Sequence, residues 1–426
     1  MKVFKFGGAS VKDAAAIRNV ADILRQYTNQ RLTVIISALG KTTNALELVV
    51  EAYFHQTGKA TDLLNDVYNL HAQISSELLS NDAAAITHAE LRALTDQVSS
   101  LFSHKPQATF NFVYDQIVSL GELLSTKIVA AYLNEQGIVT EWLDVRQLLR
   151  TDNTYREGQI NWKASIRQIL SCVPALSEQK IVLTQGFLGG TLEGFTTTLG
   201  REGSDYTAAV FANILDAESM TVWKDVPGIL NADPRLIKDA IKIPRLSYYE
   251  AIEMTYYGAH VIHPKTIKPL QNKGIPLHVR SFVLPNEDGT VVCKEAEGEQ
   301  ITLPPIIVIK NNQLLVSMLS KDFSFMAEEN LSHIYELFAK YHIKTNLTQN
   351  AAISFSACID HTPNRIRELI EDLAEAYTLK HNDNLTLITI RHYTPQILAD
   401  YIAQYEVVLE QKTRHTVQLL VKINKI

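Results

Sequence analysis

The sequence predicts an α/β protein with a mostly parallel central sheet covered by helices, followed by a region of shorter elements. Three observations carry this prediction. β-Branched apolar segments alternate with helical segments over the first two thirds of the 426 residues. A polar, proline-containing stretch at 285–305 then interrupts the alternation. Beyond it, strands and helices recur in the ferredoxin-like order βαββαβ.

The first part begins with a strand at 3–6, a Gly7-Gly8 turn and a helix at 13–27. A strand at 32–37 and a helix from about Asn44 follow, and 61–136 reads as successive helices that cover one side of a sheet. Further strands are predicted at 139–143, 181–184, 196–198, 221–223 and 277–281, and helices at 162–170, 205–215, 248–257 and 264–272.

The second part contains one complete βαββαβ unit and the remainder of another. We place a first domain at 1–284, a linker at 285–305 and a tandem region at 306–426. The first unit of the tandem occupies 313–383. The second occupies 384–426 and is complete only if it borrows the strand at 306–310, so we predict a nested pair.

The composition, 46% hydrophobic and 20% charged, is that of a globular protein. The formal net charge of −6 argues against nucleic acid or an anionic membrane as the main partner. No apolar run reaches the roughly 18 residues that span a bilayer, and the first residues read as a strand rather than a signal peptide. Three scattered cysteines without metal-ligand spacing favour the cytoplasm and no protein-bound structural metal.

Glycine turns follow several predicted strands, and in an open parallel sheet such turns gather at the strands' carboxyl ends, where ligands bind. Lys5 lies just before Gly7-Gly8, so its cation beside backbone N–H groups suits a transferring phosphoryl group. The alternative is a surface lysine on an edge strand. The sequence Gly40-Lys41-Thr42 is not a P-loop, because Ile35 stands where that motif requires glycine.

A second glycine turn, between the strand at 196–198 and the next helix, contains Arg201, whose planar fork suits a carboxylate or phosphate. Ser204 or Asp205 is the expected N-cap of that helix. An ordinary β–α turn is the alternative. Glu122 begins a helix and Asp225 follows a strand, and both positions are also favoured by capping or by the helix dipole alone.

Six ordered motifs resemble those of aspartate kinases, and the tail resembles the paired ACT regulatory domains of that family. The motifs are 5–10, 37–44, 185–189, 199–209, 223–235 and 258–264. The resemblance implies the amino-acid-kinase fold followed by two nested ACT domains. It also implies a monofunctional enzyme that transfers the γ-phosphoryl group of ATP, with Mg²⁺, to the side-chain carboxylate of L-aspartate. This reaction gives 4-phospho-L-aspartate and opens lysine, threonine and methionine biosynthesis.

The resemblance also assigns roles. Lys5 would be the transition-state cation, Asp205 the carboxylate that holds the lysine or the metal, and Gly7, Gly8 and Ser10 the phosphate loop. Arg201 would bind the α-carboxylate of aspartate and Glu122 its α-amino group. The aspartate pocket would be completed by Ser37, Thr43, Phe187 and Ser204, and the nucleotide would be bound by Lys224, Asp225, Leu230, Arg235 and His260.

The sequence departs from the family at several of these positions. Ala9 replaces a usual threonine, and His260 replaces a lysine that contacts the nucleotide. Lys224 replaces a threonine, and we expect its charge to compensate partly for His260. Glu202 replaces a usual glycine and places a carboxylate beside Arg201.

The resemblance further implies a homodimer through the ACT domains and a lysine or threonine effector near Phe325, Met326 and Asn346. Asn346 stands where lysine-responsive relatives have aspartate, and the loss of that negative charge would weaken the binding of a lysine ammonium group. Two other functions stay open: an amino-acid kinase of another substrate class, and an amino-acid sensor with an inactive kinase domain.

Overall fold

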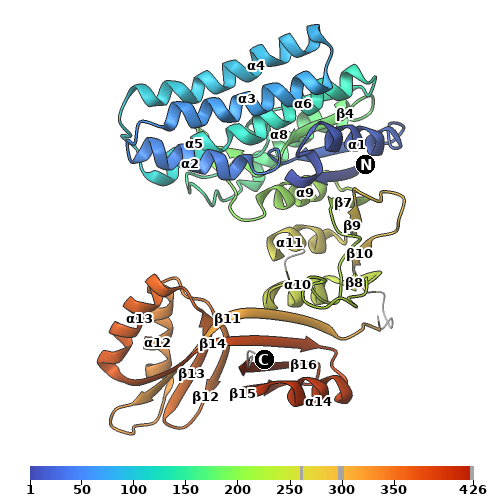
Figure 1. The fold of residues 1–426 in the computed structure, drawn as a ribbon. Coiled ribbons are helices and arrows are strands. Elements are labelled where there is room, and N and C mark those ends of the chain that lie inside the picture. Colours follow the sequence, from blue (N-terminus) through green and yellow to red (C-terminus); the bar gives the residue numbers. More distant parts are fainter. Residues whose placement is uncertain (260–261, 296–301, 423–426) are drawn as a thin grey trace. The chain divides into compact units, whose positions relative to one another are not determined.

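The computed structural model describes residues 1–259, 262–295 and 302–422, which form two compact units (Figure 1). The first comprises Met1–Ile229, Lys242–Ile252 and the described part of His260–Ile301. The second comprises Leu230–Ile241, Glu253–Ala259 and the described part of Thr302–Ile426. Residues 230–241 and 253–259, which lie inside the predicted first domain, therefore pack with the second unit. The linker bounds 285–305 stay a prediction.

An eight-stranded sheet of described residues forms the centre of the first unit, in the order β3-β4-β2-β1-β7-β9-β10-β8. The strands from β3 to β9 in that order are parallel, and β10 is antiparallel to β9. Strands β2 and β4 are buried along their whole length, as expected when helices cover both faces of a parallel sheet. The bounds are β1 Lys2–Phe6, β2 Leu32–Ile36, β3 Thr140–Leu143, β4 Ile181–Gln185, β7 Ser219–Lys224, β8 Arg245–Ser247, β9 Leu277–Ser281 and β10 Thr290–Cys293.

The helices up to α11 follow the predicted pattern, including the helical stretch at 61–136, and all of them except the end of α10 (253–257) belong to the first unit. Helices α3, α4 and α6 run side by side (Figure 1). The bounds are η1 Gly8–Val11, α1 Ala14–Arg25, α2 Thr42–Phe54, α3 Ala60–Leu78, α4 Asn81–Ser100, η2 Leu101–Ser103, α5 Phe110–Val118, α6 Leu120–Glu135, α7 Val145–Leu148, α8 Trp162–Leu176, α9 Gly203–Ile214, α10 Tyr248–Tyr257 and α11 Pro264–Lys273. Among the described helices, none is both long and apolar enough to cross a membrane.

The strand predicted at 196–198 exists, but its expected place in the parallel sheet is wrong. As β6 (Thr196–Thr198) it pairs antiparallel with β5 (Leu188–Gly190) in a separate two-stranded sheet. The buried carboxylate of Asp115 anchors it by accepting hydrogen bonds from the backbone N–H (2.9 Å) and hydroxyl (2.7 Å) of Thr198. Burial raises the pKa of Asp115 to about 6.

The second unit contains a six-stranded antiparallel sheet of described residues, in the order β12-β13-β11-β14-β16-β15. The nested pairing is confirmed: the start of β11 pairs with the end of β14, from Ile306 with Arg391 to Lys310 with Leu387. Each of these two long strands thereby serves both halves of the sheet. The bounds are β11 Ile306–Ser320, α12 Glu328–Lys340, β12 Thr345–Asn350, β13 Ser354–Asp360, α13 Pro363–Ala376, β14 Tyr377–Arg391, α14 Pro395–Gln404, β15 Glu406–Lys412 and β16 Thr416–Lys422.

Candidate active site

The candidate site lies in the first unit, where neighbouring parallel strands end. Backbone hydrogen bonds continue the strand pairing into the turns that follow. The N–H of Ser37 donates to the carbonyl of Phe6 (3.1 Å), and the N–H of Gly186 donates to the carbonyl of Ile36 (2.9 Å). The turns after β1, β2 and β4 are therefore held beside one another, as expected at the carboxyl edge of such a sheet.

Two glycines allow these turns to approach closely. A Cβ atom at Gly8 would lie 2.8 Å from the carbonyl oxygen of Gly40, which is backbone and cannot swing away. A Cβ atom at Gly186 would lie 2.5 Å from the Cβ of Ser204, at the start of α9. The missing side chains thus bring the β1 turn against the β2 turn, and the β4 turn against the helix.

Lys5, on β1, is paired with Asp205, on the first turn of α9. The Lys5 Nζ lies 2.6 Å from Oδ1 of Asp205, and both side chains are buried. A second cation approaches the same carboxylate, because Nζ of Lys224 lies 3.6 Å from its Oδ2. The Lys5 ammonium also lies over Gly7, where a Cβ atom would be 3.3 Å away. Lys5 therefore reaches the Gly7-Gly8 turn, which the resemblance assigns to the phosphate loop.

The charge of this cluster follows from its geometry. Burial alone would raise the pKa of Asp205, but the charges of Lys5 and Lys224 outweigh burial and lower that pKa to about 2. Asp205 is therefore ionised at neutral pH and faces two cations. The Lys5 ammonium beside the Gly7-Gly8 turn, with Lys224 as a second cation, favours an anionic ligand.

The expected N-cap at Ser204 or Asp205 is wrong. Helix α9 begins at Gly203, and Glu202 occupies the N-cap position in the left-handed conformation, with φ of 57° and no side-chain capping bond. The Asp205 carboxylate is engaged by Lys5 instead of by the helix N-terminus. Burial raises the pKa of Glu202. The positive charge of Lys224 lowers this pKa and the negative charge of Asp205 raises it, so the Glu202 carboxyl interacts with the lysine cluster.

Glu122 lies on the first turn of α6 and is 2% exposed. Its Oε1 accepts a hydrogen bond from the N–H of Ala38 (3.2 Å), whereas its buried Oε2 has no hydrogen-bond partner among the described residues. Burial raises the pKa of Glu122 to about 8, although the Ala38 N–H and the charge of Lys5 oppose this shift. A buried carboxyl oxygen without a partner is ready to accept from a ligand's ammonium group.

The remaining predicted aspartate-pocket residues differ in how far they are exposed. Ser37, Thr43 and Phe187 are half-buried, Ser204 is buried and Arg201 is exposed. Phe187 has a φ of 68°, a conformation that side chains rarely adopt.

Thr207 holds Phe187 in that conformation, because its hydroxyl accepts from the Phe187 N–H (3.0 Å) and donates to the Gly203 carbonyl (3.0 Å). Sequence reasoning missed Thr207, whose helical position gives no sign of this bond. Ser10 is buried and its hydroxyl donates to the Trp223 carbonyl (3.2 Å), so it ties η1 to β7.

The predicted nucleotide residues belong to both units of the described chain. Lys224 joins Asp205, and Asp225 is exposed on the same unit. Leu230 and Arg235 belong to the second unit, where Arg235 pairs with Asp233 (2.6 Å). His260 lies outside the described residues.

The candidate effector residues differ in their surroundings. Phe325 is 75% exposed, whereas Met326 is buried in the core beneath α12 and α13. The Asn346 amide is fully engaged: its Oδ1 accepts from Lys310 (2.8 Å), and its Nδ2 donates to Gln313 and Asp360 (2.8 Å each).

Comparisons with known proteins agree with this arrangement. The model of the amino acid kinase family matches residues 1–281. Lysine-sensitive aspartokinase 3 of Escherichia coli is 33% identical over 364 residues, which are 84% of this chain and 78% of the relative. Chloroplastic aspartokinase 1 of Arabidopsis thaliana is 31% identical over 379 residues, 87% of this chain, and the chain spans 65% of that relative.

Two crystal structures of Escherichia coli aspartokinase III are similar over almost the whole chain. The complex with lysine and aspartate (T-state) has 28% identity and a TM-score of 0.84, and the complex with aspartate and ADP (R-state) has 27% identity and a TM-score of 0.82. Each alignment covers 99% of this chain and 96% of the other.

Proposed function

Because the chain belongs to the aspartokinases of the amino acid kinase family, we propose that it phosphorylates the side-chain carboxylate of L-aspartate with ATP. The products are 4-phospho-L-aspartate and ADP. The observation that carries this proposal is the buried Lys5–Asp205 pair (2.6 Å) at the glycine turn, with Lys224 as a second cation.

The chemistry asks little of the protein beyond positioning and charge. The nucleophile is a carboxylate that is already ionised at neutral pH, so no general base is required. The two substrates are both anionic, and their repulsion is the main obstacle to reaction. The Lys5 ammonium would stabilise charge on the transferring group, and Asp205 would keep that ammonium fixed and protonated.

Glu122 and Arg201 would orient the aspartate. The Oε2 of Glu122, which has no partner among the described residues, would accept from the α-ammonium group. Arg201 is exposed, and its fork would bind the α-carboxylate. The half-buried Ser37, Thr43 and Phe187 would complete the pocket.

ATP and Mg²⁺ would bind beside the phosphate turn. Mg²⁺ prefers oxygen ligands and is commonly held by substrate phosphates with one or two carboxylates. Asp205 fits that role because its carboxylate is ionised and lies next to the lysine of the turn. The metal would neutralise charge on the phosphates. Lys224, Asp225, Leu230, Arg235 and His260 stay proposed nucleotide contacts.

A coupled assay of ADP release tests the substrate class. We expect turnover with L-aspartate and little with L-glutamate, N-acetylglutamate or UMP. Turnover with one of the other acceptors would instead indicate a different amino-acid kinase. No ADP release with any acceptor would favour a sensor with an inactive kinase domain.

We propose that the second unit responds weakly, or not at all, to lysine. In lysine-responsive relatives an aspartate stands at the position of Asn346, and the amide here carries no charge. The nearby ammonium of Lys310, 2.8 Å from Asn346 Oδ1, would also repel a cationic ligand. Titration of lysine and threonine into the kinase assay tests this: half-inhibition by micromolar lysine would refute it.

We also propose a homodimer formed through the second unit. Two aromatic side chains in the segment before α12, Phe323 and Phe325, are 77% and 75% exposed, which is costly for rings that stay in water. Light scattering on the purified chain should give twice the 47.8 kDa chain mass. The double variant Phe323→Asp/Phe325→Asp should give the single mass.

A further inference from the structure

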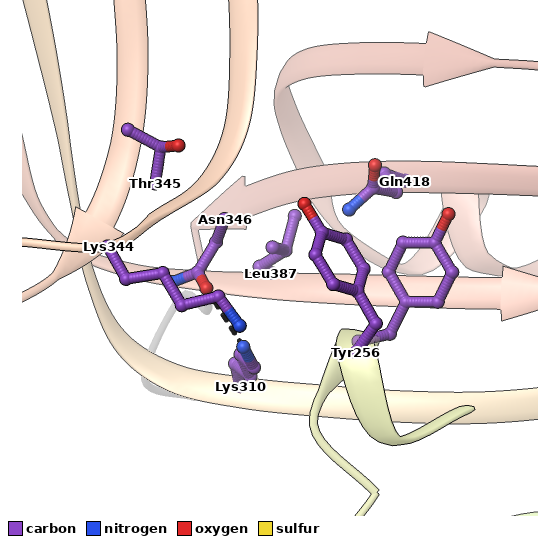
Figure 2. Close-up of a pocket in the computed structure, with 8 residues that line it drawn as sticks. Tyr256, Lys310, Lys344, Thr345, Asn346, Leu387 and Gln418 are labelled. Carbon is purple, nitrogen blue, oxygen red and sulfur yellow. Dashed lines mark hydrogen bonds between the residues drawn. The ribbon is translucent and has the colours of Figure 1, made fainter. Parts of the chain in front are cut away.

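A small pocket in the second unit is lined by two lysines that the proposed reaction does not use. Its walls come from the end of α10, from β11, β14 and β16, and from the start of β12. The lining residues are Tyr256, Tyr257, Lys310, Lys344, Thr345, Asn346, Leu387 and Gln418. Figure 2 shows Lys310 and Lys344 extending toward the same space beside Asn346.

Lys310 is built into this pocket. Its stem packs against Gly258, where a Cβ atom would lie 2.5 Å from the Lys310 Cε, and the φ of 117° at Gly258 also favours glycine. Its ammonium donates one hydrogen bond, to Oδ1 of Asn346 (2.8 Å). An ammonium group has three donors. Among the described residues the bond to Asn346 is the one hydrogen bond that Lys310 forms, so donors remain for a ligand.

Lys344 approaches from the opposite wall. It is exposed, and its Nζ lies 4.8 Å from the centre of the Tyr256 ring, a cation–π contact. This contact holds a flexible side chain over the pocket without neutralising its charge. The lining side chains leave no room for a water-sized group between them. A ligand therefore enters only when the exposed Lys344 side chain moves aside, after which its ammonium group can contact that ligand.

The charges in the pocket are unbalanced. The lining contains two ammonium groups and no carboxylate. The negative charge of the nearby Asp360 partly offsets the positive charge of Lys310. However, Oδ1 of Asp360 already accepts hydrogen bonds from the amides of Asn346 (2.8 Å) and Gln313 (2.9 Å). Burial lowers the pKa of Lys310, and the charge of Lys344 lowers it further. Two cations that repel each other in a confined space favour an anion between them.

We propose that this pocket binds a small oxyanion, a carboxylate or phosphate group, held between Lys310 and Lys344. The Tyr256 and Thr345 hydroxyls and the Gln418 amide are neutral polar groups of the lining that complete its surroundings, whereas the Asn346 amide is already engaged. The pocket would thus give the second unit an anionic ligand rather than a cationic amino acid. This inference rests on the second unit alone and does not depend on the proposed kinase reaction.

Calorimetric titration of the full-length chain with inorganic phosphate, and separately with succinate, tests the proposal at constant ionic strength. Phosphate should also bind at the Lys5 turn, so we expect two classes of phosphate site in the wild type. Lys344→Met replaces an exposed side chain. It should weaken phosphate binding at one class of site at least about tenfold, because one charge-assisted hydrogen bond is lost, and should leave the affinity of the other class unchanged. Lys310→Met should affect the same class.

Lys380→Met is the matched control, because Lys380 is an exposed lysine of β14 outside the pocket. It removes the same charge and should leave both classes unchanged. Lys5→Met should remove only the other class. Stronger binding of phosphate than of succinate, or the reverse, identifies the group that the pocket prefers. Unchanged binding in both Lys310→Met and Lys344→Met, with thermal unfolding like that of the wild type, would overturn the proposal.

Discussion

The ammonium group of Lys5 lies 2.6 Å from the Asp205 carboxylate, and this pair joins the first strand of the sheet to the first turn of α9. Both side chains are buried, so the pair is screened little by salt. Lys224 shares the same carboxylate at 3.6 Å. The resulting cluster fixes a positive charge at the glycine turn, where an anionic group would have to be stabilised.

Replacement of Asp205 by asparagine should lower kcat by roughly 10²- to 10³-fold, because the Lys5 ammonium loses its anchor at an electrostatic site. The KM for aspartate should change much less, since Glu122 and Arg201 are retained. Steady-state kinetics with both substrates measure this. Asp216→Asn, at an exposed aspartate just after α9, is the control and should behave like the wild type.

The affinity for aspartate should rise with pH until about pH 8. The pKa of Glu122 in the empty site is about 8, so below that pH the carboxyl is protonated and must lose its proton to accept from the α-ammonium group. The KM should therefore fall about tenfold per pH unit as pH rises toward 8, and then level. In Glu122→Gln this pH dependence should vanish and the KM should be high throughout. A variant that kept the wild-type slope would contradict the role of Glu122.

Glu202→Gly should stabilise the protein by about 1 kcal/mol, because glycine adopts the left-handed conformation at that position without strain. Glu202→Ala removes the same carboxyl group but keeps the backbone strain, so its free energy of unfolding should rise less than that of Glu202→Gly. Urea denaturation of both variants separates the backbone effect from the charge effect. Equal stability of the two variants would show that the left-handed φ contributes nothing.

Lys224→Ala should raise the KM for ATP about five- to tenfold, which corresponds to about 1–1.4 kcal/mol of lost interaction with the phosphates. Lys5 would still be paired with Asp205, so kcat should fall less. Lys224→Arg keeps the charge and should stay close to the wild type. An unchanged KM in Lys224→Ala would mean that Lys224 serves only the protein's own ion pairs.

Much of the fold was predictable, because local periodicity and β-branched composition specify parallel strands and their covering helices. The nested pairing followed from a counting argument: the last unit lacked a strand that only 306–310 offered. The placement of β6 was not predictable in the same way. Its three threonines are a strand pattern, but a distant buried carboxylate, Asp115, holds that strand in a separate small sheet.

The candidate site was predictable as a set of turns but not as a set of contacts. Lys5 was predicted from its place before the glycine turn, and the resemblance gave Asp205 as the carboxylate that holds the lysine or the metal. The folded chain shows which of these two applies to the protein alone, an ion pair of 2.6 Å between Lys5 and Asp205. Glu202 was expected beside Arg201, yet the left-handed turn directs its carboxyl toward the lysine cluster. The Thr207 bond to the Phe187 backbone likewise depends on two turns that meet only after folding.

Trapping of the acyl phosphate with hydroxylamine is the most direct test of the central claim. The wild type, given ATP, Mg²⁺ and L-aspartate, should form aspartyl hydroxamate in proportion to ADP. Lys5→Ala should lower this signal by roughly 10²-fold or more, because the cation at the transferring group is lost. Lys2→Ala, at the other end of the same strand, should keep it. No hydroxamate from the wild type, or equal amounts from Lys5→Ala, would contradict the assignment.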